Sequence, residues 1–124
     1  MREILFRGKR LDNNEWFYGC YQEYPNNEIC IQNEYRDYYF VVSETVGQFT
    51  GMLDKNGKKI FEGDIITGRN WLHDDRILYR VVYEENGFYY CDADDVSWHP
   101  ANIENIEVIG NIHDNPELLE ANQI

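Results

Sequence analysis

The chain has few cysteines and no long apolar run. Cys20, Cys30 and Cys91 form no CxxC pair, and any single disulfide would leave one thiol over. This usage favours a reducing compartment, with the cysteines as small apolar residues of strands. The sequence contains no stretch of roughly 18 apolar residues, the length that a membrane-spanning helix needs. The first residues also lack the apolar core of a signal peptide. We therefore expect a cytoplasmic protein without membrane contact.

Basic residues are scarce as well. The chain of 124 residues holds 11 Lys and Arg against 23 Asp and Glu, a net charge of -12 at pH 7. Residues 1–62 carry 8 basic and 10 acidic residues, whereas residues 63–124 carry 3 and 13. Affinity for nucleic acid comes largely from Lys and Arg that displace counterions, so direct binding of DNA or RNA is disfavoured. The simplest interpretation of the acidic half is a solvated surface.

Sequence motifs of common catalytic sites are missing too. There is no Walker loop, no GxGxxG and no HExxH, and the three histidines lie far apart. Asp92, Asp94 and Asp95, together with Asp74 and Asp75, could supply oxygen ligands for Mg²⁺ or Ca²⁺, with His73 or His99 beside them. Because their spacing matches no known ligand loop, we expect these acids to form turns, and we expect no metal and no cofactor. An enzyme is the weakest of the functional classes.

Aromatic and β-branched residues are abundant instead. Ten Tyr, six Phe and three Trp make the chain 15% aromatic, a composition that favours strands. Asn56-Gly57 predicts a type I′ hairpin turn, and Asn86-Gly87 predicts a second hairpin. Apolar segments bounded by turn residues predict strands over residues 3–9, 15–21, 28–32, 38–42, 76–83, 88–91, 96–98 and 106–110. Residues 59–67 form the entry to a barrel, in which Ile60 and Phe61 are strand residues and Gly63-Asp64 precedes the first barrel strand.

These signals predict an all-β fold with minor α content, in two regions. Residues 1–57 form an N-terminal region rich in β-hairpins, and this region packs on an SH3-like barrel of residues 58–124. A barrel that closes on itself leaves no exposed strand edge. Pro116 follows two residues that favour the start of a helix, so we expect a short terminal helix anchored by Leu118 and Leu119.

The first predicted hairpin is apolar on both faces. Tyr18 and Cys20 alternate with Phe17 and Tyr21, which places one apolar pair on each side of the strand. Strands with this pattern are at least partly covered on both sides. Something must therefore pack on each face, and self-association of the chain is one expectation that follows.

Four aromatic residues of the second half are candidates for a binding surface. Trp71, Tyr89, Tyr90 and Trp98 lie in or beside the predicted barrel loops, flanked by acidic residues. Trp and Tyr are enriched in the residues that dominate binding energy at interfaces. A small barrel also needs large rings to fill its core, so these side chains have a purely structural alternative.

Four short blocks, in a fixed order, carry a resemblance to a known family. They are REILFRGK with EWFYG (residues 2–9 and 15–19), TVGQFTG (45–51), GMLDKNGKKIFEGDI (51–65) and VIGNIHDNPELL (108–119). Together these blocks resemble the YopX family of phage and prophage proteins. The resemblance implies a phage or prophage setting. It supplies no catalytic residues, because the family has no established activity.

The leading hypothesis is a non-enzymatic interaction module that binds an unidentified protein of the host or the phage in the host cytoplasm. One alternative is an acidic mimic of nucleic acid that blocks a host DNA-binding protein, based on the charge of residues 63–124. The other alternative is a metal-dependent enzyme that uses Asp92, Asp94 and Asp95.

Overall fold

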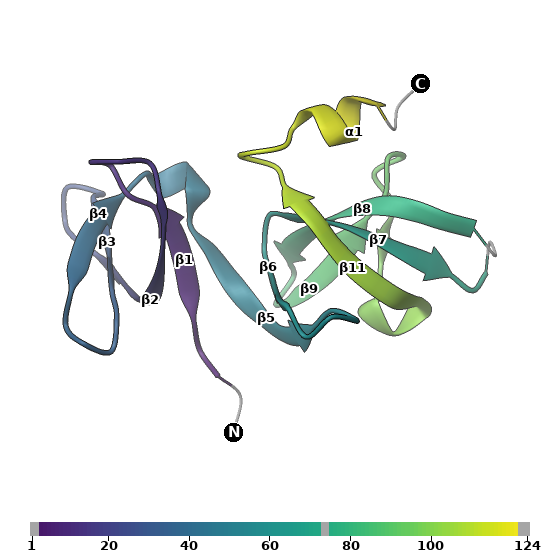
Figure 1. Ribbon diagram of the computed structural model, residues 1–124, viewed down its shortest axis with the longest axis horizontal. Coiled ribbons are helices and arrows are strands. Elements are labelled where there is room, and N and C mark those ends of the chain that lie inside the picture. Colours follow the sequence, from purple (N-terminus) through teal and green to yellow (C-terminus); the bar gives the residue numbers. More distant parts are fainter. Residues whose placement is uncertain (1–2, 73–74, 122–124) are drawn as a thin grey trace. The chain divides into compact units, whose positions relative to one another are not determined.

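The computed structural model describes residues 3–72 and 75–121. Its strands are antiparallel, and they fall into two compact units, Met1–Gly51 and Met52–Ile124 (Figure 1). The prediction of an all-β fold with minor helix is confirmed. The division falls earlier than the boundary we expected after residue 57, because the hairpin around Asn56-Gly57 is bonded to the later strands.

The elements of the first unit are strands and one helical turn. They are β1 (Phe6–Lys9), β2 (Trp16–Glu23), β3 (Ile29–Gln32), β4 (Tyr38–Val41), the 3-10 turn η1 (Ser43–Thr45) and the start of β5 (Gly47–Leu53). The end of β5 belongs to the second unit. There it is followed by β6 (Lys59–Phe61), β7 (Asp64–Asn70), β8 (Asp75–Glu84), β9 (Gly87–Cys91), β10 (Ser97–Trp98), the 3-10 turn η2 (Pro100–Asn102), β11 (Ile103–Asn111) and α1 (Glu117–Ala121).

Unit 1 is a meander whose last strand returns to its first. The strands pair in the order β4-β3-β2-β1, and the start of β5 pairs with β1 on its other edge. Beyond β1 the chain bridges Arg10 to Val41, and the Leu11 amide donates to the Phe40 carbonyl at 2.9 Å. The outer edge of β4 is therefore partly paired rather than open.

The interior of unit 1 is formed by side chains from one face of its sheet. Ile31 and Val41 are buried there, and Phe17 meets Tyr39 edge to face at 4.9 Å between ring centroids. Gly19 lies where β2 and β3 approach closely: a Cβ at this position would come within 2.0 Å of the Gln32 carbonyl oxygen. Only glycine fits there without moving the backbone.

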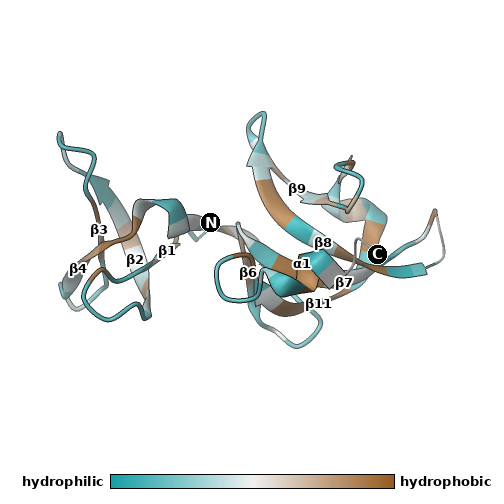
Figure 2. Ribbon diagram, turned by 90° about the horizontal axis from the view of Figure 1, so that it is seen from above, coloured by the Kyte–Doolittle hydropathy of each residue, from teal (hydrophilic) through white to brown (hydrophobic). Residues whose placement is uncertain are grey.

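Unit 2 is built on the sheet β10-β9-β8-β7-β11. Burial alternates along β8, where Tyr79 and Val81 are buried and Leu78, Arg80 and Val82 are only half-buried, as expected for a strand with one face in a core. The core joins residues from β6 through β11: Ile60, Ile66, Tyr79, Val81, Tyr90 and Ile103. Both views place α1, whose Leu118 and Leu119 are half-buried, over this sheet (Figures 1 and 2).

The two predicted hairpin turns are present, but their conformations differ from the prediction. At Asn56-Gly57 only the glycine has a positive φ, +82°, so the turn is not type I′. The Asp54 carboxylate accepts hydrogen bonds from the amides of Asn56 and Lys58, and these bonds favour the observed turn, in which only Gly57 has a positive φ. In the second hairpin the two residues with positive φ are Glu85 and Asn86, one position before the pair we predicted.

The hairpin after β5 is bonded to β11 of the same unit. The Lys55 amide donates to the Ile106 carbonyl at 2.8 Å, and the Val108 amide donates to Oδ2 of Asp54 at 2.9 Å. Both bonds tie this turn to the core of unit 2. No helix in the described ranges is long and apolar enough to cross a membrane.

Candidate protein-binding site

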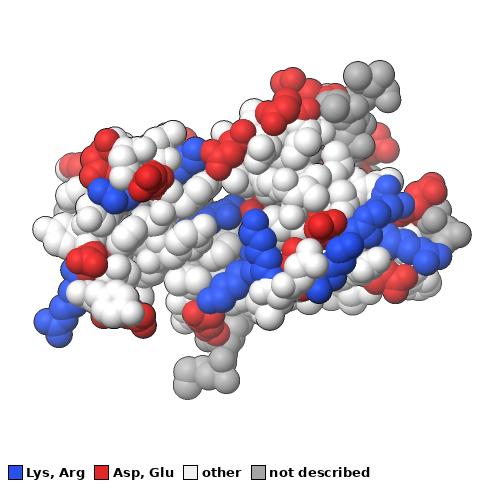
Figure 3. All heavy atoms as spheres, in the orientation of Figure 1, with Lys and Arg blue, Asp and Glu red and all other residues white. Residues whose placement is uncertain are grey.

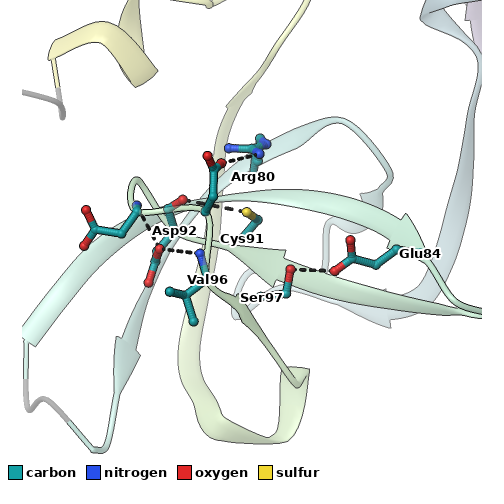
Figure 4. Close-up of polar contacts among 8 residues, drawn as sticks. Arg80, Glu84, Cys91, Asp92, Val96 and Ser97 are labelled. Atoms are coloured by element: carbon teal, nitrogen blue, oxygen red, sulfur yellow. Dashed lines mark hydrogen bonds and ion pairs between the residues drawn. The ribbon is translucent and has the colours of Figure 1, made fainter.

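The acidic cluster that we weighed as a metal site is a hairpin turn (Figure 4). Oδ1 of Asp92 accepts from the amides of Asp94 and Val96 at 2.9 and 3.0 Å. Its Oδ2 accepts from the indole of Trp98 at 2.8 Å, and Asp95 pairs with Arg80 at 2.9 Å. Both Asp92 oxygens thus serve the turn and the sheet beneath it.

Other potential ligands do not converge on this turn. Among the described residues, no three His, Cys, Asp or Glu side chains gather closely enough to hold a metal ion. His73 and Asp74 lie outside the described ranges. Cys91, beside the turn, is buried, and burial raises the pKa of its thiol above the ordinary value. A catalytic cysteine needs the opposite shift, so Cys91 lacks the character of an activated nucleophile.

The four predicted aromatic residues do not form one surface. Tyr90 is fully buried in the core, and burial raises its pKa to about 12, so it is not available to a partner. Trp98 pairs with Tyr90 across β9 and β10 and packs against the same core. Tyr89 points to the opposite face of β9, where it meets His99. Only Trp71 is largely exposed, at 58%, at the end of β7.

A different aromatic surface lies on unit 1, on the outward side of β2, β3 and β4. The register pairs Cys20 with Gln32 and Gln32 with Tyr38, and it pairs Gln22 with Cys30 and Cys30 with Phe40. Side chains of paired residues point to the same side of a sheet. We call this surface the uncharged face; its members are Tyr18, Cys20, Gln22, Cys30, Gln32, Tyr38 and Phe40 of the three strands, together with Tyr24, which follows β2. Of these, Cys30 is buried beneath its neighbours.

The uncharged face holds no Asp, Glu, Lys or Arg in any of its eight positions. The solvent face of an antiparallel sheet is normally polar, and 27% of this chain is charged. Tyr38 and Tyr18 are 58% and 44% exposed. Tyr24 lies over the face with its ring 5.7 Å from that of Phe40. An exposed group of aromatic side chains with this composition is typical of an interaction site.

The chemistry of the face keeps it neutral. The adjacent Cys30 sulfur raises the pKa of Tyr24 above its ordinary value. Gln22, Gln32 and the tyrosine hydroxyls can exchange hydrogen bonds with a partner backbone. The face therefore offers apolar area and neutral hydrogen bonds, which suit another protein better than a phosphate backbone.

Basic residues lie at the border of this face, on β1. Arg7 and Lys9 pair in register with Tyr18 and Trp16. The Arg7 guanidinium lies 4.5 Å from the Trp16 ring centroid, and the Lys9 ammonium lies 5.5 Å from it. These cations stack on an aromatic ring of their own unit. They separate the uncharged face from the rest of the sheet.

The sequence contained part of the signal for this site. The apolar alternation of the first hairpin predicted cover on both faces, and the structure leaves Tyr18 and Cys20 exposed. What the sequence could not supply was the register that brings Tyr38 and Phe40 beside them. We therefore predicted the binding surface on the barrel, on residues that the structure places on separate faces.

Comparisons with known proteins support the fold and the family. The chain matches a crystal structure of protein EF1440 from Enterococcus faecalis with a TM-score of 0.58 and 23% identity, over 96% of this chain and 99% of that one. At this identity the similarity concerns the fold alone. No curated protein matches the chain. The model of the family described as YopX protein matches residues 5–120, nearly the whole chain. The chain therefore belongs to the YopX family.

Proposed function

We propose that this protein is a non-enzymatic interaction module and that its partner binds the uncharged face. The observation that carries the proposal is the absence of any charged side chain from the eight positions of the uncharged face, four of which are aromatic. Exposed Tyr and Phe side chains supply large contact area for few rotatable bonds, which favours binding.

The proposed setting is the one that the family resemblance implies. We propose a phage or prophage protein that acts in the host cytoplasm on a protein of the host or the phage. In the same proposal, unit 2 is an SH3-like barrel that acts as a scaffold. Its five-strand order β10-β9-β8-β7-β11 is compatible with that assignment.

The acidic alternative has less support from the arrangement of charges. On the face of unit 2 seen in Figure 3, Lys and Arg side chains lie among Asp and Glu. Arg69 is in register with Glu104, and Lys55 lies 3.6 Å from Glu107. A mimic of nucleic acid needs a field of one sign, so interleaved charges favour the interaction module.

The proposal is tested by capture of the partner from lysate of the host cell. Tagged wild-type protein is compared with a Tyr18→Ser/Tyr38→Ser double variant and with Tyr35→Ser as the control. Tyr35 is the most exposed tyrosine, but it lies in the β3–β4 turn outside the face. All three changes are at exposed positions and should alter the free energy of unfolding by less than about 0.5 kcal/mol each.

We expect one protein to be retained by the wild type and by Tyr35→Ser and to be lost from the double variant. Retention should persist in washes of high salt, because the face holds no charge for salt to screen. A partner that binds the double variant as well as the wild type would contradict the proposal. Release of the partner by modest salt, from the wild type and from the double variant alike, would favour the acidic alternative.

A further inference from the structure

An apolar cleft adjoins the uncharged face at β4. It has a volume of about 230 Å³, and its apolar wall includes Leu11, Ile29, Phe40 and Val42. Phe40 belongs to both surfaces, so the two are continuous. We call this depression the β4 cleft.

The β4 cleft is large enough for one bulky side chain. An apolar cavity of about 150 Å³ accepts a benzene ring, so a Phe or Leu side chain fits in the larger volume. Leu11 at its margin is 61% exposed. Contact with an inserted side chain would remove Leu11 and the rest of the apolar wall of the cleft from water.

Two carboxylates flank the apolar wall. Glu28 lies in the β2–β3 turn and Glu44 in η1, and both side chains are exposed where they line the cleft. No Lys or Arg is among the described residues that line it. The nearest basic residue in sequence to Leu11 is Arg10, and its guanidinium is bound to the carboxylate of Asp12. The mouth of the cleft is therefore negative.

The charge of the unit decides between a second copy and a different partner. Residues 1–51 hold 8 Asp and Glu against 5 Lys and Arg, so a second copy would bring like charge to a negative mouth. Juxtaposed like charges disfavour association. A basic segment would instead be attracted by the carboxylates of Glu28 and Glu44.

We infer that the β4 cleft binds a partner segment in which a bulky apolar side chain is flanked by Lys or Arg. This inference rests on the proposed function and specifies the chemistry of the partner. The apolar side chain enters between Leu11 and Phe40, and the basic flanks lie against Glu28 and Glu44.

The test is a titration of isotope-labelled protein followed by amide NMR shifts. Three short synthetic peptides share a central Phe and differ only in flanks of Lys, Ser or Glu. We expect the Lys-flanked peptide to shift the amides of Leu11, Ile29 and Val42 and to bind more tightly than the Ser-flanked peptide. Each carboxylate should contribute roughly two- to fivefold in Kd, the effect of one exposed ion pair.

Matched variants identify the groups responsible. Glu28→Gln/Glu44→Gln should bring the Kd of the Lys-flanked peptide to that of the Ser-flanked one, whereas Glu34→Gln, an exposed turn residue outside the cleft, should leave it unchanged. Leu11→Ser should weaken binding of both peptides. All these positions are exposed, so the variants should fold like the wild type.

The outcomes separate this inference from the proposed function. Equal binding of the three peptides, or no shift at saturating concentrations of the Lys-flanked peptide, would overturn the inference. If the cleft amides instead shift as the protein itself is concentrated, the occupant is a second copy and the inference also fails. Loss of the captured partner from the Tyr18→Ser/Tyr38→Ser variant would leave the proposed function standing in either case.

Discussion

Replacement of Asp54 should destabilise the hairpin after β5 more than replacement of any other residue of that hairpin. Its side chain is only 7% exposed and accepts three backbone hydrogen bonds. The donors are the amides of Asn56 at 2.8 Å and Lys58 at 2.9 Å within the turn, and Val108 at 2.9 Å in β11. One carboxylate thus fixes the turn and joins it to a strand far away in the sequence.

The expected cost follows from the atoms that each variant loses. In Asp54→Asn the carbonyl oxygen can still accept from the turn amides, but the new NH₂ group faces the Val108 amide, so one charge-assisted bond is lost. Such a bond contributes about 1.5–3 kcal/mol. Asp54→Ala removes both acceptor oxygens and with them all three hydrogen bonds. Because the turn amides regain water, we expect a cost of about 3–4 kcal/mol rather than the full sum of the three bonds. For a chain of this size, 2 kcal/mol lowers the Tm by roughly 6–10 °C.

The pH dependence provides a second test of the same residue. Burial by itself would raise the pKa of Asp54, but the backbone donors Val108, Lys58 and Asn56 outweigh it, and the pKa lies below 3.8, its ordinary value. The folded pKa is therefore lower than the unfolded one. The stabilisation by the carboxylate is complete above the unfolded pKa and is lost as the pH falls through the folded pKa.

Urea unfolding at pH 7 and at stepped acidic pH measures both effects. The difference in stability between the wild type and Asp54→Asn should shrink below about pH 4. Asp94→Asn is the control, since Asp94 is an exposed residue of a comparable turn. The reasoning would be refuted if Asp54→Asn were as stable as Asp94→Asn at pH 7, or if the difference did not depend on pH.

Three further substitutions test the backbone and surface assignments by thermal unfolding. Glu85 has a φ of 47°, so Glu85→Asn should raise stability by about 0.5–1 kcal/mol, and a decrease would contradict the turn geometry. Gly19→Ala should cost more than about 2 kcal/mol, because its Cβ meets the Gln32 carbonyl; an unchanged Tm would show that β2 and β3 do not approach so closely. Trp71→Ala should change stability by less than about 0.5 kcal/mol, and a larger loss would mean that its ring is packed.

The fold class could be predicted from the sequence because its signals are local. Alternation of apolar residues identified most strands, and Pro116 identified the start of the short helix. The turn types were harder to predict from the sequence, because a side-chain interaction determines one of them. The carboxylate of Asp54 captures two amides of its own loop, and this overrides the preference of Asn56-Gly57 for a type I′ turn.

The position of the site could be predicted only in part. Tyr89 and Tyr90 are neighbours on one strand, so they must point to opposite faces, and the sequence alone could have excluded one of them from a shared surface. The uncharged face depends on three strands joined in one register. Cys20, Gln32 and Tyr38 become neighbours only through that pairing, and no local pattern specifies it.

The central claim, that the uncharged face is a binding site, can be tested with a probe that the chain already contains. Cys20 is exposed within the face, whereas Cys30 and Cys91 are buried. Its rate of alkylation by iodoacetamide can be measured by mass spectrometry in the free protein and in the complex recovered from host lysate. The account predicts strong protection of Cys20 in the complex, with Tyr35→Ser protein protected to the same extent. Unchanged alkylation of Cys20 while the partner stays bound would show that the partner binds elsewhere.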